Sequence, residues 1–219
     1  MKCVVTAGPT YEPLDDVRRL TNFSTGQLGC ELASYLTAQG HTVTLLLGEH
    51  ATYCGERKAR RVEKFTTTAD LRKKLRALAG KKVDAVFHAA AVSDFRFGKV
   101  WLRTARGEMT PVKEGKISTR EERGTLLAEL VATPKILAEL RQWFPKARLV
   151  GWKYEVDGGR RTVLEKARQQ LADCRTDACV ANGPAYGDGF GLVGSNAATI
   201  HLKDRAGLFE ALEEIMGSL

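Results

Sequence analysis

The sequence predicts an α/β protein with a Rossmann-like, three-layer fold, a mainly parallel sheet and an extra segment that serves as a flap or dimerisation element. Three observations support this prediction. Buried strand-like runs alternate with amphipathic helical runs, which is typical of parallel strands joined by right-handed crossovers. The 219 residues include 21 glycines and only 6 prolines, which suits tight turns between strands and helices. No linker, repeat or low-complexity stretch divides the chain, so residues 1–219 are expected to form one domain.

Short apolar, β-branched runs mark the expected strands, and the first of them runs from Lys2 to Thr6. The other expected strands are residues 42–47, 83–91, 148–152, 177–181 and 198–202. Apolar residues at helical spacing predict helices over residues 26–39, 69–79, 135–143 and 162–172, and from Gly207 onward. Residues 125–133 fit either a helix or a strand. Residues 96–124 are expected to be irregular, and a connection of that length is often a flap or a subunit contact.

Charge and composition narrow the classes of partner. Lys and Arg total 34 and Asp and Glu total 26, so the formal net charge is +8, which mildly favours small anionic ligands. No basic stripe is interleaved with aromatic residues, so nucleic-acid binding is not expected. No apolar run approaches the ~18–20 residues that span a bilayer, and the N-terminus lacks a signal-peptide pattern. We therefore expect a cytoplasmic protein without membrane contacts.

The cysteines and histidines do not indicate a zinc site. The five cysteines are an odd number without a CxxC pair, and the four histidines are scattered along the chain. Neither pattern has the spacing of zinc ligands, so reduced and mostly buried thiols are expected.

Ligands of open α/β sheets bind at the carboxyl ends of the strands, and the first strand ends in the unusual run Thr6-Ala7-Gly8-Pro9-Thr10. Roughly fifteen residues later, which is long for a strand-to-helix connection, Asn22-Phe23-Ser24-Thr25-Gly26 begins a helix. Small residues let backbone N–H groups approach a phosphate, and a helix N-terminus adds a favourable dipole. The same residues also fit a plain turn capped by Ser24 or Thr25, because the dinucleotide and P-loop fingerprints are both absent.

Two further strand ends and one loop carry candidate functional residues. In residues 89–94 (Ala-Ala-Ala-Val-Ser-Asp), the alanines allow a flat ligand against the backbone and Asp94 offers a carboxylate, although a turn capped by Asp94 fits as well. In residues 151–155 (Gly-Trp-Lys-Tyr-Glu), a lysine and a glutamate stand at the end of a buried strand and are candidate ligand contacts. The alternative is a plain ion pair on the rim of the sheet, with Trp152 in the core. Lys116 stands in the irregular segment and suits phosphate neutralisation, although a solvated lysine is commoner.

Together these motifs resemble phosphopantothenoylcysteine synthetase, also called phosphopantothenate–cysteine ligase, over essentially the whole chain. The resemblance rests on the order and approximate spacing of Thr-Ala-Gly-Pro-Thr at residues 6–10, Glu-Pro-Leu-Asp at 12–15, Val-Arg at 17–18, Asn-Phe-Ser-Thr-Gly at 22–26, Ala-Ala-Ala-Val-Ser-Asp-Phe at 89–95, Lys-Ile at 116–117 and Ala-Asn at 181–182. It implies a Rossmann-like fold and a ligase of coenzyme A biosynthesis. Such an enzyme joins 4′-phosphopantothenate to cysteine through an acyl-nucleotidyl intermediate.

The resemblance also implies roles for particular residues. Asn22 corresponds to the asparagine that holds the acyl intermediate, and Lys116 to the lysine of the Lys-Ile motif that is needed to form it. Arg18 is placed to meet a substrate anion. Gly8, Ser24 and Gly26 would cradle phosphates, and Trp152 stands where the family has an aromatic residue beside the base. The residues expected to bind the nucleotide are Gly8, Pro9, Thr10, Ser24, Thr25, Gly26, Ala90, Ala91, Asp94, Lys116 and Trp152.

Mg²⁺, a nucleoside triphosphate and a homodimer are further implied, while metal ligands stay unassigned. No FMN is expected, because the flavin-dependent decarboxylase domain often fused to this family is absent. The run Lys116-Ile117-Ser118-Thr119 and the Trp-Lys-Tyr-Glu stretch look nearer to eukaryotic, ATP-using members than to CTP-using bacterial ones, so ATP is slightly ahead of CTP. Two alternatives stay open: a non-catalytic nucleotide-binding relative, and an NAD(P)-dependent reductase that lacks both its glycine fingerprint and a Tyr-x-x-x-Lys pair.

Overall fold

The computed structural model describes residues 1–112, 115–117, 124–194 and 199–217. The main sheet contains β1 (Lys2–Ala7), β4 (Thr42–Gly48), β5 (Arg61–Phe65), β6 (Ala85–His88), β10 (Arg148–Tyr154), β11 (Ala178–Asn182), β12 (Phe190–Gly194) and β13 (Thr199–Leu202). The helices are α1 (Gln27–Ala38), α2 (Thr68–Ala77), α3 (Ile136–Trp143), α4 (Arg160–Cys174) and α5 (Arg205–Gly217). The predicted helices and most predicted strands are therefore confirmed, and the expected strand at 83–91 is shorter than predicted.

The eight strands lie in the order β13-β12-β11-β10-β6-β1-β4-β5. All neighbours from β11 to β5 pair in parallel, whereas β12 and β13 are antiparallel. The chain moves from β1 to one side through β4 and β5, then crosses to β6 and continues to β10 and β11. The strand order therefore reverses between β1 and β6, which is where open α/β sheets form their binding crevice.

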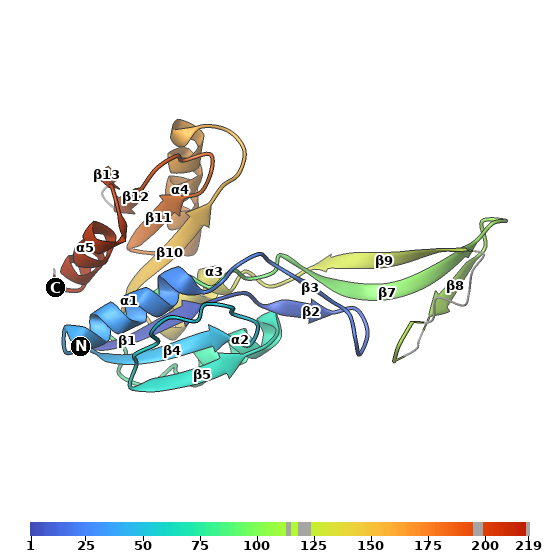
Figure 1. The fold of residues 1–219 in the computed structure, drawn as a ribbon, viewed down its shortest axis with the longest axis horizontal. Coiled ribbons are helices and arrows are strands. Elements are labelled where there is room, and N and C mark those ends of the chain that lie inside the picture. The colour runs from blue at the N-terminus through green and yellow to red at the C-terminus, as the bar shows by residue number, and fades with distance from the viewer. Residues whose placement is uncertain (113–114, 118–123, 195–198, 218–219) are drawn as a thin grey trace.

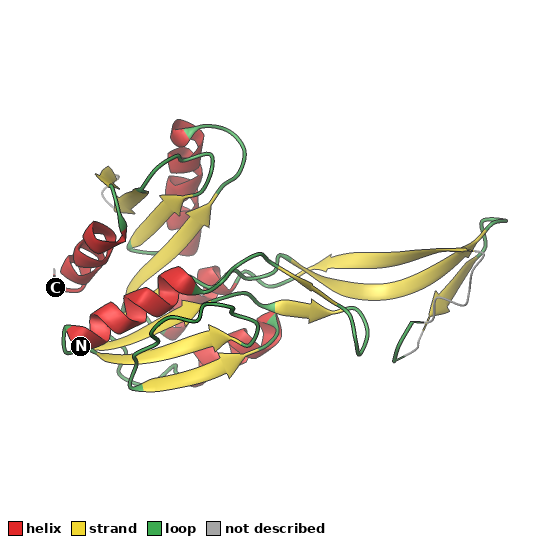
Figure 2. Ribbon diagram, in the orientation of Figure 1, coloured by secondary structure: helices red, strands yellow, loops and turns green. Residues whose placement is uncertain are grey.

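Helices cover both faces of this sheet, which confirms the three-layer, Rossmann-like prediction (Figures 1 and 2). One core contains Leu32 and Leu36 of α1, Leu208 of α5 and Phe87 of β6. The opposite core contains side chains of α2 and α3, and a third cluster lies under α4. Among the described residues, no helix is long and apolar enough to cross a membrane. All five cysteines are free thiols and only Cys54 is exposed, as predicted.

The expectation of an irregular segment over residues 96–124 is wrong. Strands β7 (Phe95–Thr104), β8 (Met109–Val112) and β9 (Gly124–Ala132) form a separate antiparallel sheet, here called the arm, which projects away from the main sheet (Figure 1). The ambiguous run at 125–133 is thus a strand. An irregularity in the β7–β9 pairing between Phe97 and Val100 breaks the period-two pattern, so the sequence does not show the alternation of a regular strand.

The long connection between β1 and α1 also contains structure that the sequence analysis missed. Strands β2 (Tyr11–Pro13) and β3 (Arg19–Thr21) form a short antiparallel hairpin, which extends beside the arm (Figure 1). Each strand has only three residues, which is too few for a periodic signal. The hairpin therefore emerges from the pairing of its two strands rather than from local propensity.

A buried polar pair joins β6 to β1 below the crevice. The Nδ1 atom of His88 lies 3.0 Å from the hydroxyl of Thr6, and that hydroxyl accepts a hydrogen bond of 3.1 Å from the Ala90 amide. His88 is only 6% exposed, and burial lowers the pKa of its imidazole to about 4. The pair therefore ties the end of β1 to the backbone that follows β6 and keeps His88 neutral at pH 7.

Stability should fall as the pH drops from about 6.5 to about 4 because of His88. In this window the unfolded chain binds a proton on this imidazole and the folded chain does not, so folding loses up to roughly 3 kcal/mol at this site. His88→Asn retains a polar partner for Thr6 and removes the titration, so urea unfolding at pH 7, 5.5 and 4.5 should show a flatter pH dependence. The exposed control His201→Asn should keep the wild-type slope. Equal slopes for all three proteins would contradict the assignment.

Candidate active site

The carboxyl ends of β1 and β6 are joined by main-chain contacts into one surface, here called the crevice floor (residues 8–10 and 90–91). Pro9 and Ala91 form an isolated parallel bridge. The Ala91 amide donates to the Gly8 carbonyl over 3.0 Å, and the Thr10 amide donates to the Ala91 carbonyl over 3.1 Å. Two segments that the sequence analysis treated separately are therefore parts of one rigid backbone surface at the point where the strand order reverses.

The start of α1 lies directly against this floor because Gly8 and Gly26 lack side chains. Both glycines have positive φ angles, +81° and +80°. A Cβ on Gly8 would lie 2.8 Å from the Cβ of Ala51, and a Cβ on Gly26 would lie 3.2 Å from the Gly8 Cα. Larger residues would therefore separate the helix from the turn. Ala51, which follows β4, was not predicted to take part, since nothing local to it indicates this contact.

The N-terminus of α1 can receive an anion. Gly26 occupies the N-cap position and supplies no side-chain cap, although the hydroxyl of Thr25 accepts from the Gln27 amide over 3.2 Å. The first amides of a helix carry a partial positive charge and have no partners within the helix. With Gly8 and Gly26 in contact, these amides lie beside the β1 turn, which is the arrangement that binds phosphate groups in nucleotide sites.

Asn22 and Asp94 border the same floor. The amide nitrogen of Asn22 donates to the Ala91 carbonyl over 3.1 Å, so this residue lies at the junction of the two strand ends. The hydroxyl of Thr10 accepts from the Ser93 amide over 2.8 Å, which holds the chain just before Asp94. Asp94 itself is exposed. The structure thus brings the predicted residues of three motifs together: Gly8, Pro9, Thr10, Asn22, Gly26, Ala90 and Ala91, with Asp94 at the edge.

Lys116 and Arg18 lie elsewhere, at the far end of the β2–β3 hairpin. A guanidinium nitrogen of Arg18 donates to the Ile117 carbonyl, and the Asp16 amide donates to the Gly115 carbonyl over 2.7 Å. Four residues separate Arg18 from Asn22, which at the rise of a strand is roughly 13 Å. Among the described residues, the hydrogen bonds of residues 115–117 go to residues 15–18 of the hairpin, whereas Asn22 bonds to Ala91. Ser118 and Thr119, the other residues of the predicted motif, lie outside the described residues.

The third predicted strand end contains an ion pair on the rim. Lys153 contacts Glu155 over 3.0 Å, and Lys166 of α4 contacts the other carboxylate oxygen. These ammonium groups, Lys166 first, lower the pKa of Glu155 despite its partial burial. Trp152 packs partly buried against the core under α1 and α5, and its indole nitrogen is buried without a hydrogen-bond partner. The structure therefore contains the ion pair on the rim and the tryptophan packed against the core, which was the alternative interpretation of this strand end.

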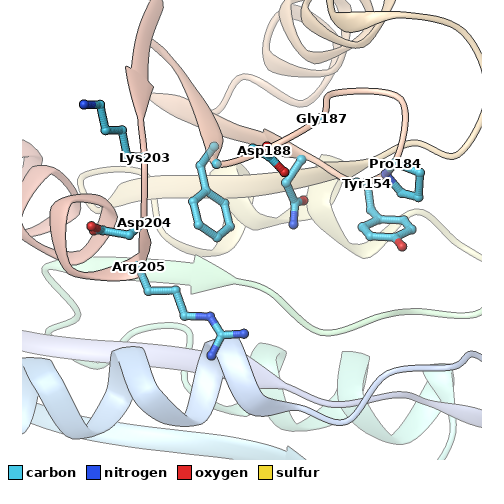
Figure 3. A pocket seen from close by; sticks show the side chains of 11 residues that line it. Tyr154, Pro184, Gly187, Asp188, Lys203, Asp204 and Arg205 are labelled. Carbon is cyan, nitrogen blue, oxygen red and sulfur yellow. The ribbon is translucent and has the colours of Figure 1, made fainter.

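A cavity of about 640 Å³ opens beyond the carboxyl ends of β10 and β11 (Figure 3). Tyr154 and Phe190 contribute aromatic walls, and Asp188 and Arg205 contribute opposite charges. Most of its residues were missed by the sequence analysis, which quoted only Tyr154 and Asn182 among them. The glycine-rich run of residues 183–191 marks a loop here, but the loop becomes part of a cavity only through the packing of β12 and α5.

Metal-binding residues are few. Within the described ranges, no group of three His, Cys, Asp or Glu side chains is placed to hold a metal ion. A single exposed carboxylate still suits Mg²⁺ that arrives with a nucleotide. In such sites the protein usually supplies one or two carboxylates, and phosphates and water supply the remaining ligands. Asp94 is the exposed carboxylate beside the crevice floor.

Known proteins are similar to this chain in sequence and in fold. The coenzyme A biosynthesis bifunctional protein CoaBC of Thermococcus kodakarensis is 31% identical over 182 residues, which are 83% of this chain and 41% of that protein. The chain thus spans less than half the length of the curated relatives that it matches first.

Two solved structures cover essentially the whole chain. The DNA/pantothenate metabolism flavoprotein of Streptococcus pneumoniae superposes with a TM-score of 0.82 at 25% identity, over 100% of this chain and 99% of that one. The H337A mutant of Cab2 in complex with phosphopantothenate-cysteine shares the fold, with a TM-score of 0.73 at 22% identity over 99% and 85%. The family described as the DNA/pantothenate metabolism flavoprotein C-terminal domain matches residues 1–214. The chain therefore belongs to that family, as the resemblance to phosphopantothenoylcysteine synthetase predicted.

Proposed function

We propose that residues 1–219 form one phosphopantothenate–cysteine ligase domain that uses a nucleoside triphosphate. The observation that carries the proposal is the crevice floor, where two strand ends, two glycines and the uncapped start of α1 meet at the reversal of strand order. The name of the relative from Thermococcus kodakarensis supports it, since that protein is a coenzyme A biosynthesis protein, and one neighbour of the same fold holds phosphopantothenate-cysteine. No flavin is needed in this chemistry.

The reaction requires activation of a carboxylate, which is a poor electrophile. A carboxylate oxygen of 4′-phosphopantothenate attacks the α-phosphorus, the bond to the bridging oxygen breaks, and pyrophosphate leaves. The amine of cysteine then attacks the acyl carbon of the mixed anhydride, loses a proton and displaces the nucleoside monophosphate. Both steps crowd anions together, so fixed N–H groups and cations aimed at the developing charge accelerate them.

The residues of the crevice suit these steps. Gly8 and Gly26 bind phosphate oxygens through backbone amides, while Ser24, whose amide donates to the Asn22 carbonyl over 2.9 Å, binds them through its hydroxyl. Ala90 and Ala91 lie against the nucleotide. Asn22 holds the acyl intermediate from its position beside the Ala91 carbonyl. Mg²⁺, held by Asp94 and phosphate oxygens, would supply neutralisation of the triphosphate charge. ATP stays slightly ahead of CTP, on the strength of the Trp-Lys-Tyr-Glu sequence at residues 152–155.

Lys116 and Arg18 provide the remaining positive charge, and a second copy of the chain completes the site. One face of the arm supports a homodimer: the cross-strand pairs Phe97–Leu130 and Leu102–Leu126 lie on the same face. Leu130 and Leu126 are 54% and 42% exposed. A contiguous apolar face of this kind usually marks an interface. The contacts of residues 115–117 with the tip of the hairpin, and not with Asn22, support the same arrangement.

Lys116→Gln should abolish product formation and leave the fold intact. The side chain is exposed, so its loss costs little stability, whereas removing one charge-stabilising donor typically lowers kcat by about 10²–10³. Pyrophosphate release with 4′-phosphopantothenate, cysteine and either ATP or CTP measures this. The exposed control Lys146→Gln should match the wild type. Wild-type turnover by Lys116→Gln would refute the role of the lysine, and nucleotide binding without any wild-type pyrophosphate release would indicate a non-catalytic relative.

Leu126→Asp should yield a monomer with little activity. A buried, unpaired carboxylate at the interface should weaken the dimer by roughly thirtyfold or more. The control is Thr125→Asp, which introduces the same charge one residue away on the opposite face, where Thr125 pairs with Arg103. Light scattering at micromolar concentration separates the two variants. A dimeric Leu126→Asp, or a wild-type protein that is monomeric, would rule out this interface.

A further inference from the structure

Two segments about one hundred residues apart in sequence meet at the far end of the β2–β3 hairpin. Residues 15–18 on the hairpin contact the main-chain groups of residues 115–117, which lie between β8 and β9 of the arm in the sequence. The Asp16 amide donates to the Gly115 carbonyl, the Ile117 amide donates to the Asp15 carboxylate over 3.1 Å, and Arg18 donates to the Ile117 carbonyl. We call this set of contacts the clasp. It fixes the residues on both sides of Lys116.

Asp15 is the centre of the clasp. Its side chain is only 1% exposed and pairs with Arg18 over 3.3 Å. One carboxylate oxygen accepts from the amides of Val17 and Arg18, at 3.0 Å and 2.7 Å, and the other accepts from Ile117. Although partial burial raises the pKa of Asp15, these amides and the guanidinium lower it overall, so the carboxylate stays charged at neutral pH. Asp15 thus shapes the hairpin and captures the distant segment with the same group.

Ile117 is an apolar anchor beside an exposed lysine. The isoleucine is 5% exposed, whereas the preceding Lys116 is exposed. Burial of a whole isoleucine side chain is worth ~1.5–3 kcal/mol, and both main-chain polar groups of Ile117 are bonded within the clasp. The base of the Lys116 side chain is therefore held from both neighbouring peptides, while its ammonium group can reach outward.

Placement matters for a lysine that neutralises charge in a transition state. A long side chain on an unanchored loop samples many positions, and a misplacement of about 1 Å can cost a factor of about 10² in rate. Supporting residues that fix the backbone remove this loss before substrate binds. The clasp also contains Arg18, so the two cations expected at the substrate move together as one unit.

We infer that Asp15 is a positioning residue for Lys116, which it presents to substrate by clasping the main chain of residues 115–117. The inference rests on the proposed ligase function, because it assumes that Lys116 acts in the transition state. Asp15 itself touches no reacting atom. Its removal should therefore lower kcat through Lys116 and leave the KM for the nucleotide nearly unchanged, whereas the KM for 4′-phosphopantothenate should rise because Arg18 loses its carboxylate partner.

A double-mutant cycle in the full chain tests this inference. Asp15→Ala should reduce kcat by about tenfold to a hundredfold, while Asp157→Ala, an equal charge change at an exposed residue outside the clasp, should behave as wild type. Because Asp15 acts through Lys116, Asp15→Ala combined with Lys116→Gln should be as slow as Lys116→Gln alone. Multiplied losses in the double variant, or wild-type kcat in Asp15→Ala, would overturn the inference. Full activity of Lys116→Gln would instead refute the proposed function on which it rests.

Ile117→Ala tests the clasp without disturbing the turn that Asp15 also supports. It removes the anchor and keeps the bonds from Val17 and Arg18 to Asp15, so it should lower kcat in the same way. Amide exchange of the ¹⁵N-labelled free protein gives a readout independent of catalysis. The amide of residue 117 should exchange at least tenfold faster in Asp15→Ala and Ile117→Ala than in Asp157→Ala. Equal exchange rates in all three variants would show that the clasp does not form.

Discussion

The main-chain junction between the carboxyl ends of β1 and β6 is the constraint on which the candidate site depends. The amide of Ala91 bonds to the Gly8 carbonyl and the amide of Thr10 bonds to the Ala91 carbonyl, so neither strand end can move alone. The buried Thr6–His88 pair and the bond from Ser93 to Thr10 hold the same junction from below and from the side. Buried polar groups must be hydrogen-bonded, and here that requirement also sets the shape of the crevice floor.

The two glycines at this junction allow a close backbone approach that larger residues would prevent. Because Gly8 and Gly26 lack Cβ atoms, the start of α1 lies against the β1 turn, an arrangement that suits phosphate binding. The arm differs from the main sheet because it buries little of its own apolar surface and leaves Leu126 and Leu130 exposed. The hydrogen-bonded crevice floor and the exposed leucines of the arm are the two features on which the proposed dimeric site rests.

Much of the site could be predicted from the sequence because its parts are local motifs. Gly8, Asn22, Gly26 and Ala91 stand next to strand or helix ends whose positions follow from periodicity, and parallel strands bring such ends to one edge of the sheet. The arm could not be predicted in this way. Its strands contain an irregularity and lack a conventional buried face, so residues 96–124 showed no regular alternation. The cavity bordered by Tyr154 and Phe190 was equally hidden, since its walls come from separate elements.

The sequence by itself determined the class of fold, the helices, the parallel core strands and the two glycine-bearing turns, because each depends on short-range spacing and on the conformations that glycine permits. Only the tertiary structure decided which strand ends meet, where the hairpin and the arm project, and that Asp15 and the Asp16 amide hold the residues on either side of Lys116. Those relations depend on hydrogen bonds and burial between residues far apart in the chain. No local pattern encodes such contacts, because their energy appears only when the whole sheet has formed.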